Sequence, residues 1–155
     1  MVERTVVVGF GNLLMGDDGV GIHVVRSLAE RGLPRGAEAV DGGVASLEIL
    51  GSLLDAGRII IVDALAGGGE PGSVYRLTPA DLGQAETSPG FSLHDFTLPQ
   101  TLALLARTAS LPPIVIYGVE PAGMDPGLEL SPPVAVAAGR VADLIIADLE
   151  DCFDA

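Results

Sequence analysis

Hydrophobic and polar positions follow two patterns along this chain. Three short runs are almost continuously apolar and rich in β-branched residues: TVVVGF (5–10), RIIIVDA (58–64) and PIVIYGV (113–119). Such runs are typical of strands that are buried on both faces of a parallel sheet. Two weaker runs, AEAV at 37–40 and SVYRL at 73–77, add two candidate strands. The pattern therefore predicts about five strands.

Helical spacing of apolar residues fills the intervals between these runs. It is found in four segments, at 18–31, 44–54, 98–109 and 131–149. The first segment stops before Gly32, and we expect Asp17 or Asp18 to be its N-cap. Strands that alternate with helices predict an α/β fold: a single-domain three-layer sandwich, with a twisted, mostly parallel sheet of about five strands and helices on both faces.

Composition and charge narrow the classes of function. The chain has 155 residues, 48% of them apolar, and a formal net charge of -13. This size fits one domain, residues 1–155, with an acidic C-terminal tail at 147–155. A strongly negative field repels nucleic acid and anionic membrane surfaces, so we expect neither as a partner. No apolar run approaches the roughly 20 residues that cross a bilayer, and no signal peptide is recognisable, so we expect a cytoplasmic protein.

The loop that follows the first strand run, GFGNLLMGDDG, poses the central chemical question. In an open α/β sheet, ligands bind outside the carboxyl ends of the strands. A phosphate cradle needs G-x-G-x-x-G closing directly on a helix, and this loop fits that spacing badly. It also ends in Asp17 and Asp18, whose charges repel a pyrophosphate. We therefore favour a cation as the ligand of this edge.

Three side chains are candidates for a metal site: Asp18, Asp63 after the second strand run, and His94 in a polar loop before the third helix. Two carboxylates and an imidazole with open positions suit zinc or nickel. Each residue also has an ordinary interpretation, as a helix cap, a local turn and a surface histidine respectively. The other histidine, His23, falls about 140° around the helix from Asp18 and is not expected to share its site.

Five motifs give the chain a resemblance to the maturation endopeptidases of nickel–iron hydrogenases. GFGNLLMGDDGVG resembles the N-terminal signature of that family, G-x-G-N-x-L-x-x-D-[DE]-G-x-G, position for position. DGGVASLEIL and IIIVDAL are similar to its second and third motifs. SLHDFTLPQTL is similar to the segment that carries its histidine, and IYGVEP to the segment after the last buried strand. The resemblance extends from about Val6 to Pro121.

The resemblance implies a cytoplasmic peptidase that removes a C-terminal extension from the precursor of the hydrogenase large subunit after nickel insertion. The matching positions are Asp18, Asp63 and His94, as both catalytic and metal-contacting residues. The nickel is expected to arrive in the substrate, with zinc or cadmium able to substitute, and the enzyme is expected to be a monomer. Many relatives have glutamate at the position of Asp18, so the choice between Asp17 and Asp18 stays open; we assign the contact to Asp18 and a capping role to Asp17.

Other functions remain open at this stage. The same trio would serve a metal chaperone or sensor without peptidase activity, and an aspartic dyad or a small-substrate amidase would use the same carboxylates. A nucleotide binder is the remaining class. The chain has no G-x-S-x-G, no H-E-x-x-H and only one cysteine, Cys152, which limits the other hydrolytic mechanisms.

Two further expectations concern substrate contact. The glycines of the first loop and the Gly42–Gly43 pair are expected to let the backbone approach a substrate closely. The polar loops GGGEPGS (67–73) and QAETSPGF (84–91) are candidate docking segments for a protein substrate.

Overall fold

A five-stranded sheet forms the centre of the molecule in the computed structural model, which describes residues 4–82 and 97–154. The strand order is β2-β1-β3-β5-β4. The first four are parallel to one another, and β4 is antiparallel to β5. The bounds are β1 Thr5–Phe10, β2 Ala37–Gly43, β3 Arg58–Ala64, β4 Val74–Leu77 and β5 Ile114–Val119. All five expected strands are confirmed.

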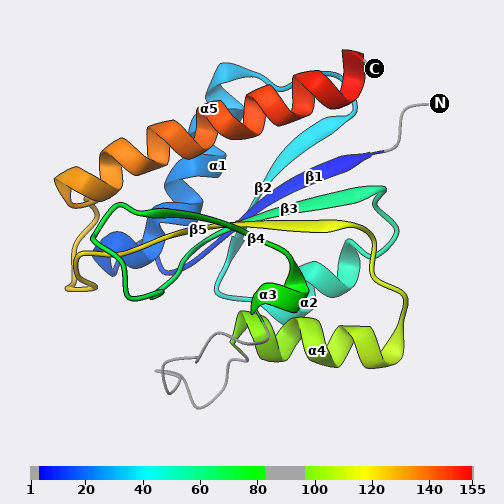
Figure 1. Cartoon of the computed structure of the whole chain (residues 1–155), viewed down its shortest axis with the longest axis horizontal. Coiled ribbons are helices and arrows are strands. Elements are labelled where there is room, and N and C mark those ends of the chain that lie inside the picture. The colour runs from blue at the N-terminus through cyan, green and yellow to red at the C-terminus, as the bar shows by residue number, and fades with distance from the viewer. Residues whose placement is uncertain (1–3, 83–96, 155) are drawn as a thin grey trace.

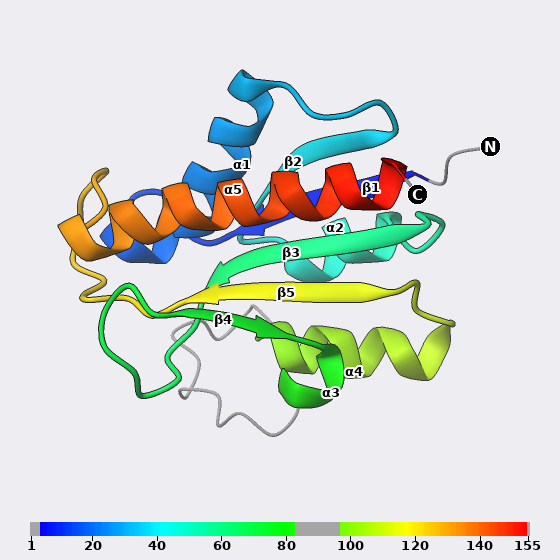
Figure 2. The same cartoon turned by 45° about the horizontal axis from the view of Figure 1, so that its top comes forward.

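Helices cover both faces of this sheet, so the expected three-layer sandwich is confirmed (Figures 1 and 2). On one face lie α1 and α5, and on the other lie α2, α3 and α4. The bounds are η1 Gly16–Gly19, α1 Val20–Arg31, α2 Ser46–Ser52, α3 Pro79–Leu82, α4 Leu98–Thr108 and α5 Pro132–Asp154. None of the helices described is long and apolar enough to cross a membrane.

The alternation of side chains along the strands explains the two apolar cores. In β3, Ile60 and Val62 pack on the α1 and α5 side, whereas Ile59 and Ile61 pack on the α2 and α4 side. All four side chains are fully buried. Because both faces of the strand are covered, its sequence reads as a continuous apolar run. Side chains alternate between the two faces along a strand, so Asp63 falls on the same face as Ile59 and Ile61. It therefore lies on the side of the α2 and α4 layer, at the end of the strand.

Two differences from the expected elements have simple causes. Helix α5 continues past 149 to Asp154, through most of the segment expected to be an acidic tail, because its apolar stripe holds the helix to the sheet as far as the fully buried Leu149 and no breaker follows. Helix α3 spans only four residues, which is too short to produce a recognisable apolar period.

Candidate active site

The carboxyl ends of β1, β3 and β5 lie at one edge of the sheet, because these strands are parallel and adjacent (Figure 1). The loop after β1 turns through η1 into α1 at this edge. Strand β3 ends in Asp63 and Ala64, which pair with Gly118 and Val119 of β5. This arrangement brings the first loop and Asp63 to the same edge, as the sequence predicted.

Glycines in the first loop serve the packing of the chain on itself. A Cβ atom on Gly9 would lie 2.1 Å from the carbonyl oxygen of Gly21, and one on Gly11 would lie 1.9 Å from that of Asp18. A side chain at Gly9 would push β1 away from α1, and one at Gly11 would push the first loop away from η1. These contacts assign Gly9 and Gly11 to the packing of the chain on itself, and their expected role in substrate approach stays a prediction. Gly43 differs, since it has a φ of +54° and open space where a Cβ would lie.

Asp18 holds the first loop in place through one backbone contact. Its Oδ2 accepts a hydrogen bond of 2.8 Å from the backbone N–H of Asn12. Neither acid is the N-cap of a helix: the N-cap of α1 is Gly19 and that of η1 is Met15, and neither N-cap residue makes a side-chain capping hydrogen bond. The expected N-cap role of Asp17 or Asp18 at this helix is therefore wrong, because the 3-10 turn separates both acids from the start of α1.

Asp63 is a partly buried carboxyl group with little compensation for its charge. Among the residues that the structure describes, its one hydrogen-bond donor is the adjacent N–H of Ala64, 2.8 Å from Oδ1. Burial raises the pKa of Asp63 well above its ordinary value, and the negative charge of Asp18 raises it further. The Ala64 N–H acts in the opposite direction and is too weak to offset them. Within 4–82 and 97–154, neither Asp18 nor Asp63 forms a salt bridge.

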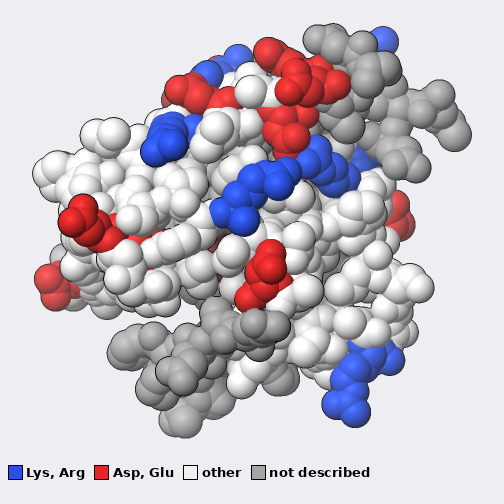
Figure 3. Space-filling model, in the orientation of Figure 1, with Lys and Arg blue, Asp and Glu red and all other residues white. Residues whose placement is uncertain are grey.

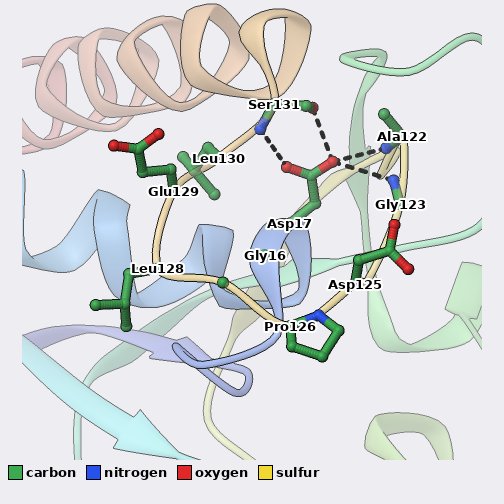
Figure 4. A pocket seen from close by; sticks show the side chains of 11 residues that line it. Gly16, Asp17, Ala122, Gly123, Asp125, Pro126, Leu128, Glu129, Leu130 and Ser131 are labelled. Carbon is green, nitrogen blue, oxygen red and sulfur yellow. Dashed lines mark hydrogen bonds between the residues drawn. The ribbon is translucent and has the colours of Figure 1, made fainter.

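Asp17 is the opposite case, a buried carboxylate with a full set of donors (Figure 4). It accepts hydrogen bonds from the N–H and hydroxyl of Ser131 at 2.7 and 2.8 Å, and from the N–H groups of Ala122 and Gly123 at 2.8 and 3.2 Å. Burial alone would raise the pKa of Asp17, but these four hydrogen bonds outweigh burial and lower it. Asp17 thus ties the start of η1 to the segment between β5 and α5.

That β5–α5 segment borders a cavity of about 660 Å³ beside Asp17, which is widely open to solvent. Its lining comes from η1 and from the segment itself: Gly16, Asp17, Ala122, Gly123, Asp125, Pro126, Gly127, Leu128, Glu129, Leu130 and Ser131. A short parallel bridge holds the two walls together, with Gly127 N–H donating to Leu14 at 2.8 Å and Gly16 N–H donating to Gly127 at 2.9 Å. Nothing in the sequence pattern indicated this cavity.

Glu120 is a second buried carboxyl group that sequence reasoning did not single out. It is 6% exposed, and its Oε1 accepts hydrogen bonds from Gly67 N–H, Gly69 N–H and the Tyr75 hydroxyl at 2.8–2.9 Å. The bond to Glu120 raises the pKa of Tyr75. Glu120 therefore fixes part of the 67–73 loop that we expected to be a docking segment. Its place directly after the last buried strand was the available signal.

His94 lies outside the described residues, as does the candidate docking segment 84–91. Thr97, three residues after His94, caps α4: its hydroxyl accepts from Gln100 N–H, and the Gln100 side chain accepts from Thr97 N–H. Within the part of the chain that the structure describes, no three metal-ligating side chains gather at one point. His23 is partly buried, and its Nε2 has no hydrogen-bond partner among the same residues.

Comparison with known proteins identifies the family to which this chain belongs. A family model for hydrogenase maturation proteases of the HycI type matches residues 22–148. The chain belongs to the hydrogenase maturation protease family.

Relatives of this maturation protease match it over nearly its whole length. It is 30% identical to the hydrogenase 2 maturation protease of Escherichia coli K12 over 96% of its own length and 92% of that protein. The solved hydrogenase maturating endopeptidase HybD from E. coli has a TM-score of 0.79 and 31% identity, covering 96% of this chain and 93% of that one. The hydrogenase 2 maturation peptidase from a Thaumarchaeota archaeon has a TM-score of 0.73 and 30% identity, with coverages of 96% and 99%.

Family membership decides between the classes of function that the sequence left open. Hydrogenase maturation proteases are hydrolases, so the chain is an enzyme rather than a metal carrier or a nucleotide binder. The roles of the individual acids have to be argued from their surroundings.

Proposed function

We propose that this protease cuts the C-terminal extension from the nickel-loaded precursor of a [NiFe] hydrogenase large subunit, and that Asp18, Asp63 and His94 contact the nickel of the substrate. The names of its relatives connect them with hydrogenase maturation, and one is called a hydrogenase maturating endopeptidase. The metal in this proposal is part of the substrate, so the enzyme is expected to hold little metal at rest.

The observation that carries the proposal is the uncompensated charge at Asp63. A partly buried carboxyl group with one N–H donor among the described residues and a second carboxylate nearby is costly to ionise without a counter-charge. A divalent cation supplies that counter-charge, and oxygen donors in an open site suit nickel and zinc, with cadmium as a substitute probe. Asp17, by contrast, already has four donors and has no need of a cation.

The position of α4 supports a role for His94. Helix α4 leads into the amino end of β5, so it runs opposite to the strands and begins at their carboxyl edge (Figure 1). Its N-cap, Thr97, therefore lies at the edge where β3 ends in Asp63. Three residues span at most roughly 10 Å. His94 would then add a neutral imidazole nitrogen to the two carboxylates.

Protonation of Asp63 couples substrate recognition to pH. The raised pKa of Asp63 means that its carboxyl group holds a proton more readily than an ordinary aspartate does. A metal ligand must be deprotonated, so contact with nickel releases this proton from Asp63. The hydrogen bond from Asn12 N–H orients the carboxylate of Asp18, which is the second oxygen donor to the metal in this proposal. When bound, the metal would supply Lewis-acid polarisation of the scissile carbonyl or orientation of the peptide.

The proposal is tested with nickel-loaded and nickel-free precursor, each incubated with wild type and with Asp18→Ala, Asp63→Ala and His94→Ala. We expect wild type to cut only the loaded precursor and each variant to lose at least about 100-fold in rate, because a metal ligand matters at least as much as a residue that orients one. Asp55→Ala is the matched control, since its side chain is 81% exposed. Undiminished cleavage by any of the three variants would remove that residue from the site.

We also propose that the enzyme acts as a cytoplasmic monomer. The support is the net charge of -13, which disfavours self-association and attachment to anionic membranes. Sedimentation equilibrium at several protein concentrations tests the monomer, and a concentration-dependent mass would contradict it. Cell fractionation tests the location.

A further inference from the structure

Exposed apolar side chains border the cavity beside Asp17. Leu14 is 64% exposed, Leu128 is 60% exposed and Met124 is 36% exposed. Leu14 and Leu128 belong to the two segments joined by the Met15–Gly127 bridge, so the bridge holds them on neighbouring backbone. Large side chains that are this exposed on adjacent segments are characteristic of interaction surfaces.

Acidic side chains flank these apolar ones. Asp125 and Glu129 both line the cavity, and Figure 4 shows them on opposite sides of the segment that carries Leu128. None of the eleven lining residues is basic. In Figure 3, the left end of the molecule shows two red patches in a white surface, and the blue patches lie above and to the right. We call Leu14, Met124, Asp125, Leu128 and Glu129 the cavity rim.

The cavity and the proposed metal site are adjacent along the chain. Asp17 lines the cavity and is bonded directly to Asp18 along the chain. The same Asp17 carboxylate anchors both ends of the β5–α5 segment, through Ala122 and Gly123 on one side and Ser131 on the other. The cavity and the proposed metal site are therefore linked through η1, which carries both Asp17 and Asp18.

We infer that the cavity rim is a docking surface for the large-subunit precursor, and that it receives an apolar side chain of that protein next to an arginine or lysine. This inference rests on the proposed function. The cavity is large enough for a bulky side chain, and burial of Leu14 and Leu128 provides affinity. Asp125 and Glu129 select a basic neighbour through charge complementarity and speed its approach. The same acids, without basic residues in the lining, disfavour an acidic partner.

Cleavage kinetics with the nickel-loaded precursor test this surface. Two double variants are compared with wild type: Leu14→Ser with Leu128→Ser, and Asp125→Lys with Glu129→Lys. We expect KM to rise about tenfold or more in each, with kcat within about twofold, because the contacts bind the substrate but do not touch the scissile bond. The charge-reversed variant should also lose the salt dependence of kcat/KM. Controls are Leu144→Ser and Glu150→Lys, which change exposed side chains of α5.

Binding of nickel-free precursor, followed by fluorescence anisotropy, separates the two proposals. If wild type fails to cut loaded precursor but the rim variants still weaken binding, the proposed function fails and the docking surface is supported. If wild type cuts and the folded rim variants keep both KM and Kd, the docking surface is wrong. A wild-type dimer that the rim variants convert to monomer would assign the surface to a second copy and also overturn the inference.

Discussion

Two aspartates at the same edge of the sheet, one buried and one partly buried, have opposite surroundings. Asp17 is 2% exposed, receives four hydrogen bonds, and has a lowered pKa. Asp63 receives one hydrogen bond from the part of the chain that the structure describes, lies near the charge of Asp18, and has a raised pKa. Full hydrogen bonding is what a structural carboxylate needs, whereas an uncompensated one costs stability and is kept for chemistry. The comparison supports a structural role for Asp17 and, in the proposed function, a role in the reaction for Asp63.

The largest expected effect comes from Asp63→Asn. The amide keeps the shape of the side chain but removes the charge that a metal requires, so cleavage of loaded precursor should fall at least about 100-fold. The same change removes a costly ionisation, so Tm at pH 7 should rise by a few degrees. Cleavage assays and calorimetry measure the two effects. A variant that is both inactive and less stable would mean that Asp63 supports the fold, and the comparison would fail.

Asp17→Ala should produce the reverse result. It leaves the N–H groups of Ala122, Gly123 and Ser131 without their acceptor and should lower the free energy of unfolding by about 2–4 kcal/mol. Urea denaturation measures this loss. Activity per folded molecule should fall much less than in Asp63→Asn. A stable Asp17→Ala protein that no longer cuts would place Asp17 among the catalytic residues instead.

The central strands could be predicted from the sequence because a strand that is buried on both faces is a continuous run of apolar residues. Each buried run, such as Ile59 to Val62, contains its own signal. Asp63 was accessible to the same reasoning, since a polar residue that ends a buried strand falls at a predictable edge of the sheet. Helix spacing likewise placed α1 and α4 to within two residues at either end.

The contacts of Asp17 and Glu120 were not readable, because their partners are remote in the chain. The donors to Asp17 are 105 to 114 residues away, and the glycine N–H donors to Glu120 are 51 and 53 residues away. No local pattern encodes such contacts, and an acid pair beside a helix start resembles a cap. The sequence therefore indicated that one of the two adjacent acids was surplus to capping, but not that neither acid caps α1.

The carboxyl groups of Asp17 and Asp63 should change the stability of the fold in opposite directions as pH rises. The lowered pKa of Asp17 gives stability that is present above its ordinary value of 3.8 and is lost as pH falls through the folded pKa. The advantage of wild type over Asp17→Ala should therefore shrink below pH 3.8. The raised pKa of Asp63 lowers the free energy of unfolding. This loss is absent below pH 3.8, the ordinary pKa, and grows as pH rises through the folded pKa.

Thermal denaturation from pH 3 to 8 measures both differences. Asp63→Asn should match wild type at the acidic end and exceed it increasingly toward neutral pH. Parallel curves for wild type and Asp63→Asn would show that the carboxyl group of Asp63 is not perturbed in the folded protein, and the proposed cation site would lose its main support.

Ser131→Ala should give the smallest effect and the finest test of the comparison. It removes only the hydroxyl that donates to Asp17 at 2.8 Å and keeps the Ser131 N–H bond, so the loss should be about 1–2 kcal/mol. Ser52→Ala is the matched control, because its exposed hydroxyl bonds to a helix carbonyl and its removal should change stability by less than about 0.5 kcal/mol. If Ser131→Ala has no effect in the Asp17→Ala background but destabilises wild type, the hydroxyl acts through the carboxylate. Equal effects in both backgrounds would show that the hydroxyl acts independently of Asp17.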